Sequence, residues 1–345
     1  MTGPRTDIDA ALRALGADLA QGELGGALTC GPYVLLRPIG SGGIADVYVA
    51  ARAGGGEARY AVKMLRPGVD GEEIVARFER EHEVLAALRH PGIVRVIDAG
   101  VHARGTPWIA MPLVDGPAIT VAADEARMTV DARRALVLQA LEAVAAAHAK
   151  QVVHRDLKPG NVLAEPGSGA GPAGGLRVKV VDFGIARTIG ARGLRITPVG
   201  VAHRLGTPEY MAPEQWADGI AACDARADVF ALGMLLGELC AGVLPQVGTR
   251  ADPSAGGGAA ADSGGRVRRR ARPGAPCLPS AALRALAEQD ADRATRIARA
   301  RGRRSVEALA AELEATVDDA VAAMTAARAA DRPRDAGEAA KVLGR

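Results

Sequence analysis

Cysteine is scarce in this sequence, and the cysteines are scattered. The four residues Cys30, Cys223, Cys240 and Cys277 form no C-x-x-C pair. This pattern argues against a disulfide framework or a zinc site and favours reduced thiols in a cytosolic protein. Aromatic residues are also few, at 3% of the chain. Because Ala, Gly and Arg are in excess, we attribute that shortage to coding bias and not to function.

Long apolar runs and export signals are missing as well. The longest apolar stretch, Val229 to Pro245, is interrupted by Glu238, and it is too short to span a bilayer. Asp7 and Asp9 stand where a signal peptide would be apolar. A net charge of +3 over 345 residues does not point to nucleic acid or a membrane surface. We therefore expect a cytoplasmic protein with no membrane anchor and no nucleic-acid partner.

The chain divides into a short extension and a large two-part domain. Residues 1–30 look like an N-terminal extension in which Ile8, Leu12, Leu15 and Leu19 fall at helical spacing. We assign the domain to 31–345, with a first lobe over about 31–113 and a second over about 114–345. A chain of this length can bury a large core.

The two lobes differ in their expected secondary structure. Strands are expected at Tyr33–Pro38, Val47–Ala51, Tyr60–Leu65, Val94–Ala99 and Trp108–Leu113, with one main helix from about Glu72 to Leu88. After Asp131 the pattern is helical, except for short strands around Val152 and Val178–Val181. The fold class is therefore α+β, with a small β-rich lobe and a larger helical lobe.

Two segments have the composition of loops. Glu165–Gly175 is rich in Gly, Pro and Ser and lies between two short strands. Residues 249–276 are rich in Gly and Ala and contain the arginine run Arg266–Arg272. That run could recruit acidic substrates or nucleic acid, but we favour a solvated loop.

A glycine-rich turn joins the first two expected strands. It reads Ile39-Gly40-Ser41-Gly42-Gly43-Ile44-Ala45-Asp46-Val47. Glycines let backbone N–H groups approach phosphates with no Cβ in the way. A dinucleotide-binding turn would open a helix, whereas here a strand follows. Alone the motif is weak evidence for phosphate binding, because many glycine-rich hairpins have no ligand.

Lys63 lies inside an apolar strand, where an unpaired ammonium is strongly unfavourable. In the following helix Glu81 falls in the apolar stripe of Ile74, Phe78, Leu85 and Leu88. The two inward-facing charges can satisfy each other. A purely structural ion pair is the alternative on these residues alone.

Two further motifs supply carboxylate and amide oxygens. His154-Arg155-Asp156-Leu157-Lys158-Pro159-Gly160-Asn161 follows a long amphipathic helix, and Asp182-Phe183-Gly184 follows an apolar strand. Asp156 can accept a hydroxyl proton, while Asn161 and Asp182 offer the hard oxygen ligands that magnesium prefers.

With these motifs in this order, the chain from about Tyr33 onward resembles eukaryotic-type protein kinases of the bacterial Ser/Thr branch. The resemblance implies ATP and Mg²⁺ as cofactors, with Asp156 as the base, Lys158 on the γ-phosphate, and Asn161 and Asp182 on the metal. Lys63, paired to Glu81, would contact the α- and β-phosphates. The implied ATP-binding residues are Ile39, Gly40, Ser41, Gly42, Gly43, Ile44, Ala45, Asp46, Val47, Lys63, the gatekeeper Met111, and Leu113 in the hinge.

Later segments fit the same resemblance. Gly206–Glu214 resembles the end of the activation loop, Asp228 the buried aspartate that orders the catalytic loop, and Arg332 the late arginine that pairs with Glu214. Lys158 and Thr207 favour Ser/Thr specificity over tyrosine. His148 is expected to be a satisfied core histidine.

The sequence also departs from the family pattern. Ala45 stands where a third glycine is usual, and Pro112 removes a hinge donor while keeping its carbonyl. Leu244 to about Val317 matches the family poorly, which leaves target choice open.

Regulation is expected in the activation loop. The candidate phosphorylation sites are Thr197, which we prefer, and Thr188. A phosphate there would order the loop through arginines such as Arg155. A loop that is active without modification is the alternative.

The expected activity is that of a non-specific serine/threonine protein kinase acting on protein substrates, including itself, in cytoplasmic signalling. A pseudokinase would typically lack Lys63, Asp156 or Asp182, all of which are present. Small-molecule phosphotransferases of similar fold generally lack Ala212-Pro213-Glu214. Oligomeric state, substrates and upstream signal are left open.

Overall fold

The computed structural model describes residues 28–41, 45–54, 59–65, 87–102, 105–167, 173, 175–183, 208–217, 223–244, 278–326 and 328–344. Most of the N-terminal extension and the whole loop 249–276 lie outside these ranges. The helix expected from Glu72 also lies outside them, except for its expected end at Leu88, which is buried but not helical.

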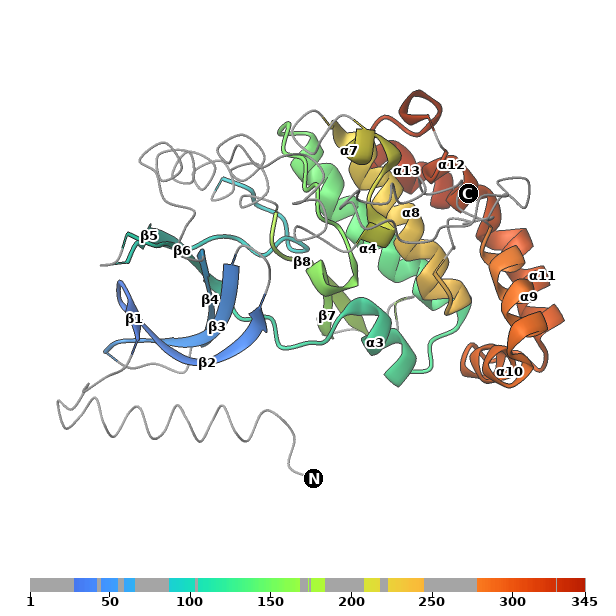
Figure 1. Ribbon diagram of the computed structural model, residues 1–345, viewed down its shortest axis with the longest axis horizontal. Coiled ribbons are helices and arrows are strands. Elements are labelled where there is room, and N and C mark those ends of the chain that lie inside the picture. Colours follow the sequence, from blue (N-terminus) through green and yellow to red (C-terminus); the bar gives the residue numbers. More distant parts are fainter. Residues whose placement is uncertain are drawn as a thin grey trace, which may run out of the picture.

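The first lobe is a six-stranded antiparallel sheet with the order β1-β2-β3-β4-β6-β5 (Figure 1). Its strands are β1 (Thr29–Cys30), β2 (Tyr33–Ser41), β3 (Ala45–Arg52), β4 (Arg59–Leu65), β5 (Asp98–Val101) and β6 (Pro107–Pro112). Together with the helical second lobe described below, this sheet confirms the α+β fold class.

Alternation along β4 separates the two faces of this sheet. Ala61 and Leu65 pack into the main core, which continues into the second lobe, whereas Val62 packs into a smaller cluster on the opposite face. Because successive side chains of a strand point to opposite faces, Lys63 shares the face of Ala61 and Leu65. Lys63 is thereby directed toward the second lobe.

The strand expected over Val94–Ala99 begins only at Asp98. The N–H of Val94 donates to the carbonyl of Val180 at 3.0 Å, and Ile93 forms a parallel bridge with the same residue. On either side of Ile93, the Gly92 carbonyl and the Val94 N–H hydrogen-bond to Val180 and not to the sheet, which is why the prediction was wrong there.

Three aromatic residues cluster on the face of the sheet that carries Val62. The Tyr33 ring lies 5.1 Å from that of Tyr60 and 5.7 Å from that of Trp108, both edge-on. A Cβ at Gly31 or Gly100 would come within 2.7 or 2.8 Å of the Trp108 ring. Glycine is thus required at both positions by the close approach of the indole.

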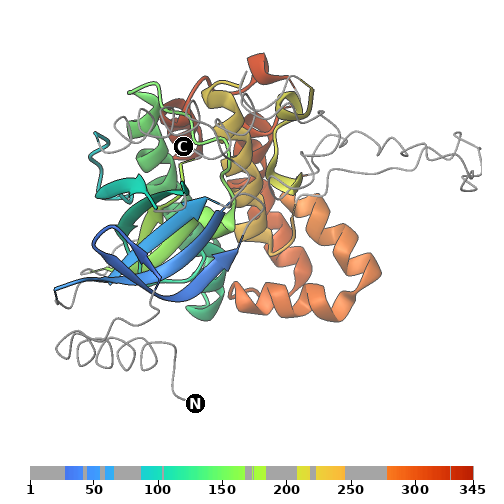
Figure 2. The ribbon, with the colours of Figure 1, turned by 60° about the vertical axis from the view of Figure 1, so that its left-hand side comes forward.

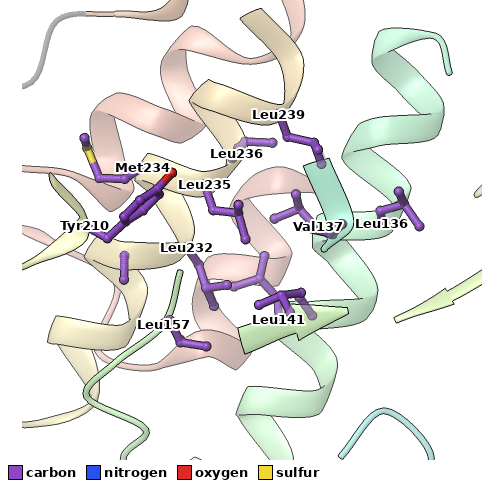
Figure 3. Packing of buried hydrophobic residues seen from close by; sticks show 14 of the residues in the cluster. Leu136, Val137, Leu141, Leu157, Tyr210, Leu232, Met234, Leu235, Leu236 and Leu239 are labelled. Atoms are coloured by element: carbon purple, nitrogen blue, oxygen red, sulfur yellow. The ribbon is translucent and has the colours of Figure 1, made fainter. Parts of the chain in front are cut away.

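The second lobe is built around two long helices, α4 (Val130–His148) and α8 (Ala225–Ala241). Leucine and valine side chains of both helices interdigitate in its core, as Figure 3 shows. The apolar run that begins at Val229 is the body of α8, which is buried along nearly its whole length. In the described part of the chain, no helix has the length and apolarity needed to cross a membrane.

Shorter elements surround this pair of helices. They are α3 (Ile119–Glu125), α7 (Pro213–Ala217), α9 (Pro279–Gln289), α10 (Ala291–Ala300), α11 (Val306–Thr316), α12 (Asp318–Met324) and α13 (Ala336–Leu343), with 3₁₀ turns at Pro159–Asn161, Pro208–Tyr210 and Ala329–Asp331. Helices α9 to α11 lie at the end of the lobe farthest from the sheet (Figures 1 and 2).

A two-stranded hairpin, β7 (Val162–Pro166) with β8 (Leu176–Val180), lies between the lobes. The loop expected over Glu165–Gly175 connects these strands, although Glu165 and Pro166 belong to β7. No strand forms around Val152, where one was predicted. Its N–H donates to the Ala147 carbonyl and closes the end of α4, and Gln151 has a φ of 60°.

Two buried arginines meet at Asp124, and one of them, Arg301, ties the poorly matching region to the rest of the lobe. Arg133 of α4 donates to the carbonyls of Met128, Ala123 and Leu239. Arg301, after α10, donates to the Cys240 carbonyl. Both pair with one Asp124 oxygen, at 2.8 and 3.1 Å. Burial lowers the pKa of Arg301 to about 10. This carboxylate thus helps hold α10 against α3 and α8.

Candidate active site

Asp228 of α8 organises the segment that carries Asp156. Its carboxylate is fully buried and accepts the backbone N–H groups of His154 and Arg155, each at 2.7 Å. These bonds hold Arg155 at a φ of 66°, a conformation that non-glycine residues rarely adopt. The expected role of Asp228 in ordering this loop is confirmed.

His148 is a satisfied core histidine, as expected. Its Nδ1 accepts the N–H of Ala336 at 3.1 Å, so its Nε2 carries the proton and donates to Asp228 at 2.9 Å. The N-terminus of α13 is thereby connected to the loop through two side chains.

Asp156 lies beside two of the residues expected to work with it. Its Oδ2 is 3.2 Å from the Lys158 ammonium, and the Asn161 amide donates to its backbone carbonyl at 2.7 Å. The side chain of Asp156 remains 20% exposed, so a substrate hydroxyl can reach it. Because Asn161 uses its amide nitrogen for these contacts, its amide oxygen is the atom suited to a cation.

Asp182 joins the two lobes. It follows β8 with a φ of 61°, and its Oδ1 lies 3.0 Å from the Lys63 ammonium of β4. The preceding residue, Val181, donates its N–H to the Asn161 carbonyl at 3.0 Å. The structure therefore brings Lys63, Asp156, Asn161 and Asp182 to one place. Glu81, the predicted partner of Lys63, lies outside the described residues, so that pairing stays a prediction.

The rings of His154 and Phe183 lie beside the segments that carry Asp156 and Asp182. The two rings lie 4.6 Å apart, and His154 Nε2 donates to the Val181 carbonyl at 2.9 Å. Burial lowers the pKa of His154, so the ring is neutral and its Nδ1 can accept the N–H of Asp156 at 3.3 Å. One histidine thus links the segments of Asp156 and Asp182.

The glycine-rich turn connects the end of β2 to the start of β3. Gly40 pairs with Val47 and Ser41 with Asp46, while Gly42, Gly43 and Ile44 lie outside the described residues. Among the described residues, a Cβ on Gly40 would meet only Val47, at 3.8 Å, which is an ordinary van der Waals contact. Ile39 beside it is an exposed apolar side chain.

Met111 lies near the end of β6, and Leu113 comes directly after the strand, which ends at Pro112. Met111 is buried and pairs with Ala61 in register. With Leu88, Ile109, Asp182 and Phe183 it lines a partly open hollow. The N–H of Leu113 is bonded to the Arg59 carbonyl at 3.1 Å. Only the side chain and the carbonyl of Leu113 are left to face a ligand.

The predicted pair of Glu214 and Arg332 is present. Arg332 donates to both carboxylate oxygens, at 2.6 and 3.0 Å, and its side chain is completely buried. The guanidinium also stacks 4.8 Å from the centre of the Phe230 ring. Thr188, Thr197 and Thr207 lie outside the described residues.

Sequence reasoning missed two contacts in this region. The Tyr210 hydroxyl donates to Glu238 of α8, and burial raises the pKa of both groups. The position of Glu238 inside an apolar run was the available signal. The second missed residue is Gln215, which bonds to the Arg155 carbonyl at 3.1 Å. Nothing in its sequence context distinguishes it.

The chain resembles known proteins in both sequence and structure. The protein kinase domain model matches residues 33–255. Serine/threonine-protein kinase pkn2 of Myxococcus xanthus is 36% identical over 220 residues, which are 62% of this chain and 25% of that protein. Serine/threonine-protein kinase pkn3 of the same organism is 35% identical over 284 residues, or 80% and 48%.

Among solved structures, the PknI kinase domain of Mycobacterium tuberculosis aligns with a TM-score of 0.57 and 26% identity, covering 93% of this chain and 98% of that one. This chain spans a quarter to about half of the two curated relatives. Since the family model matches more than half of the chain, on the segment that holds Lys63, Asp156 and Asp182, the chain belongs to the protein kinase domain family.

Proposed function

We propose that this chain is a serine/threonine protein kinase that transfers the γ-phosphate of ATP to hydroxyl groups of protein substrates. One observation carries the proposal. The ammonium of Lys63 lies 3.0 Å from Asp182, and the residue before Asp182 is bonded to Asn161, next to Asp156. The ammonium of the first lobe thus lies close to a proton acceptor and to oxygen atoms suited to a metal ion, which come from the second lobe.

Each side chain has a part in the proposed reaction. Asp156 accepts the proton of the substrate hydroxyl, since it is accessible and held in place by Asn161 and the loop. Lys158, 3.2 Å from Asp156, neutralises charge on the transferred group. Lys63 contacts the inner phosphates, and the turn from Ile39 to Val47 covers them. Met111 and Leu113 line the place of the base.

Asn161 and Asp182 fit magnesium. Both present hard oxygen atoms, and magnesium usually takes only one or two protein ligands and completes its shell with water and phosphate. Among the described residues, no group of three or more His, Cys, Asp or Glu side chains is arranged to hold a metal ion. When bound, the ion would supply charge neutralisation between the phosphates.

The preference for Ser/Thr hydroxyls is supported by Lys158 and by the relatives, which are named serine/threonine kinases. We also propose autophosphorylation, with Thr197 and then Thr188 as the acceptor sites, and action in cytoplasmic signalling. The pseudokinase alternative predicts nucleotide binding without transfer, and the experiment below separates the two.

The test is phosphate transfer from ATP, with magnesium, to the protein itself and to a basic protein substrate, followed by phosphoamino-acid analysis. Asp156→Asn should lose on the order of 100-fold or more in kcat, while still binding nucleotide. Asp131→Asn makes the same change at a 77% exposed carboxylate on α4 and should behave as the unchanged protein.

Equal transfer by the unchanged protein and Asp156→Asn would rule out Asp156 as the base. Nucleotide binding with no transfer by any form would favour the pseudokinase.

A further inference from the structure

Gln215 is a buried amide whose two ends are both engaged. It lies in α7, directly after Glu214, and is 6% exposed. Its Oε1 accepts the N–H of Ala212 at 3.0 Å, and its Nε2 donates to the carbonyl of Arg155 at 3.1 Å. One side chain therefore spans from the end of the activation segment to the residue before Asp156.

The polarity of these contacts selects an amide. The backbone N–H of Ala212 can only donate, and the carbonyl of Arg155 can only accept. A carboxylate would place an acceptor against the Arg155 carbonyl, and an apolar side chain would leave two buried backbone groups without their bonds. Glutamine satisfies both partners at once, because its amide has one atom that accepts and one that donates.

The peptide group that Gln215 contacts is the one that carries Asp156. Its carbonyl is held by Gln215, and its N–H, which belongs to Asp156, is held by His154 at 3.3 Å. On the preceding side, Asp228 holds the N–H of Arg155 at 2.7 Å. Because Arg155 has the unfavourable φ of 66°, its orientation depends on such external bonds.

We infer that Gln215 is a positioning residue for phosphoryl transfer, which couples the end of the activation segment to the orientation of Asp156. The inference rests on the proposed kinase activity. When the segment around Ala212 is in this conformation, the bridge fixes the peptide plane of Arg155 and Asp156. When that segment moves, the plane loses the restraint from Gln215 and keeps only those from His154 and Asp228.

The first test compares Gln215→Met with Gln139→Met. Gln139 of α4 makes the same kind of bridge elsewhere, since it accepts the N–H of Val178 at 2.9 Å and donates to the Leu176 carbonyl at 3.2 Å. Gln215→Met should lower kcat on the order of 10-fold to 100-fold, with KM for ATP within about twofold. Gln139→Met should leave kcat within about twofold while lowering Tm. The rates are expressed per nucleotide-binding site, counted by titration with a fluorescent ATP analogue.

The second test is Gln215→Glu, which keeps the size of the side chain. Gln215 lines a small hollow together with Arg155, Asp156 and Asp228. Burial beside acceptors and carboxylates raises the pKa of an introduced carboxyl group. Once protonated, that group can donate to the Arg155 carbonyl. The ratio of its kcat to that of the unchanged protein should therefore rise as pH falls from about 8 to 6, while the ratio for Gln215→Met stays flat.

Equal kcat values for Gln215→Met and Gln139→Met would overturn the inference. If Gln215→Met does not fold, a kcat ratio for Gln215→Glu that is independent of pH would overturn it as well. Absence of Asp156-dependent transfer in the unchanged protein would instead remove the proposed function, and this inference with it.

Discussion

Lys63 and Asp182 form an ion pair of 3.0 Å between the two lobes. One residue comes from the centre of β4 and the other from the chain after β8, so the contact exists only because the lobes face each other. Both side chains are about one-fifth exposed, at 20% and 23%, which leaves them accessible to a nucleotide. This pair brings a phosphate-binding cation next to a metal-binding carboxylate.

Replacing Lys63 tests that arrangement. Lys63→Met should lower kcat/KM for ATP by on the order of 100-fold or more, because a preorganised positive charge on the phosphates is lost. Lys179→Met is the matched control, since Lys179 makes a 3.3 Å ion pair with Glu165 at similar exposure. It should leave ATP kinetics within about twofold. Similar losses in the two variants, measured by steady-state kinetics, would contradict the assignment.

Asp228→Asn should slow phosphate transfer without removing a group that touches substrate. The carboxylate accepts two backbone N–H groups and His148, and an amide cannot accept all three. We expect kcat to fall on the order of 10-fold and the free energy of unfolding to fall by roughly 2 kcal/mol or more. Asp318→Asn, at a buried carboxylate bonded to Ser280, should lower stability and spare kcat.

The buried ion pair of Arg332 and Glu214 should contribute far more to the stability of the folded protein than an exposed ion pair. Arg332→Met leaves the Glu214 carboxylate, 18% exposed, without its cation, and should cost about 3–5 kcal/mol in denaturant unfolding. Arg284→Met breaks a pair whose side chains are 50% and 49% exposed and should not change Tm measurably. Restored stability in the double variant Glu214→Leu/Arg332→Met would show that the cost arises from the unpaired charge.

Glu238 should make stability depend on pH. Burial raises its pKa above the ordinary 4.5, so the folded state holds this proton more tightly than the unfolded state. The contribution of protonated Glu238 to the free energy of unfolding is fully present below pH 4.5. It is lost as pH rises through the folded-state pKa. Glu238→Gln should therefore gain Tm relative to the unchanged protein as pH rises through this window.

The control residue, Glu314, should change stability with pH in the opposite direction. The hydrogen bond from Arg284 lowers the pKa of Glu314, so its small contribution is present above the ordinary pKa and is lost on acidification. Glu314→Gln should thus differ most from the unchanged protein at neutral pH. Parallel pH curves for Glu238→Gln and the unchanged protein would contradict the prediction.

Sequence patterns correctly predicted the elements whose formation depends on residues close together in the chain. Alternating and β-branched residues predicted β2, β3 and β4, and the order of Lys63, Asp156 and Asp182 indicated the family before any contact was known. The strand predicted around Val152 failed because its N–H closes α4, and that depends on how the helix ends and not on the β-propensity of valine.

The amino-acid order thus determines which residue types occur, at what spacing and in which element, since periodicity depends on near neighbours. Apart from pairs that the family resemblance implied, such as Glu214 with Arg332, the partners of buried polar groups were decided only by the tertiary structure. Gln215 meets Arg155 across 60 positions, Tyr210 meets Glu238 across 28, and Arg133 meets the Leu239 carbonyl across 106. Each of these bonds satisfies a buried polar group whose need arises only when distant elements pack together. No local pattern contains that information.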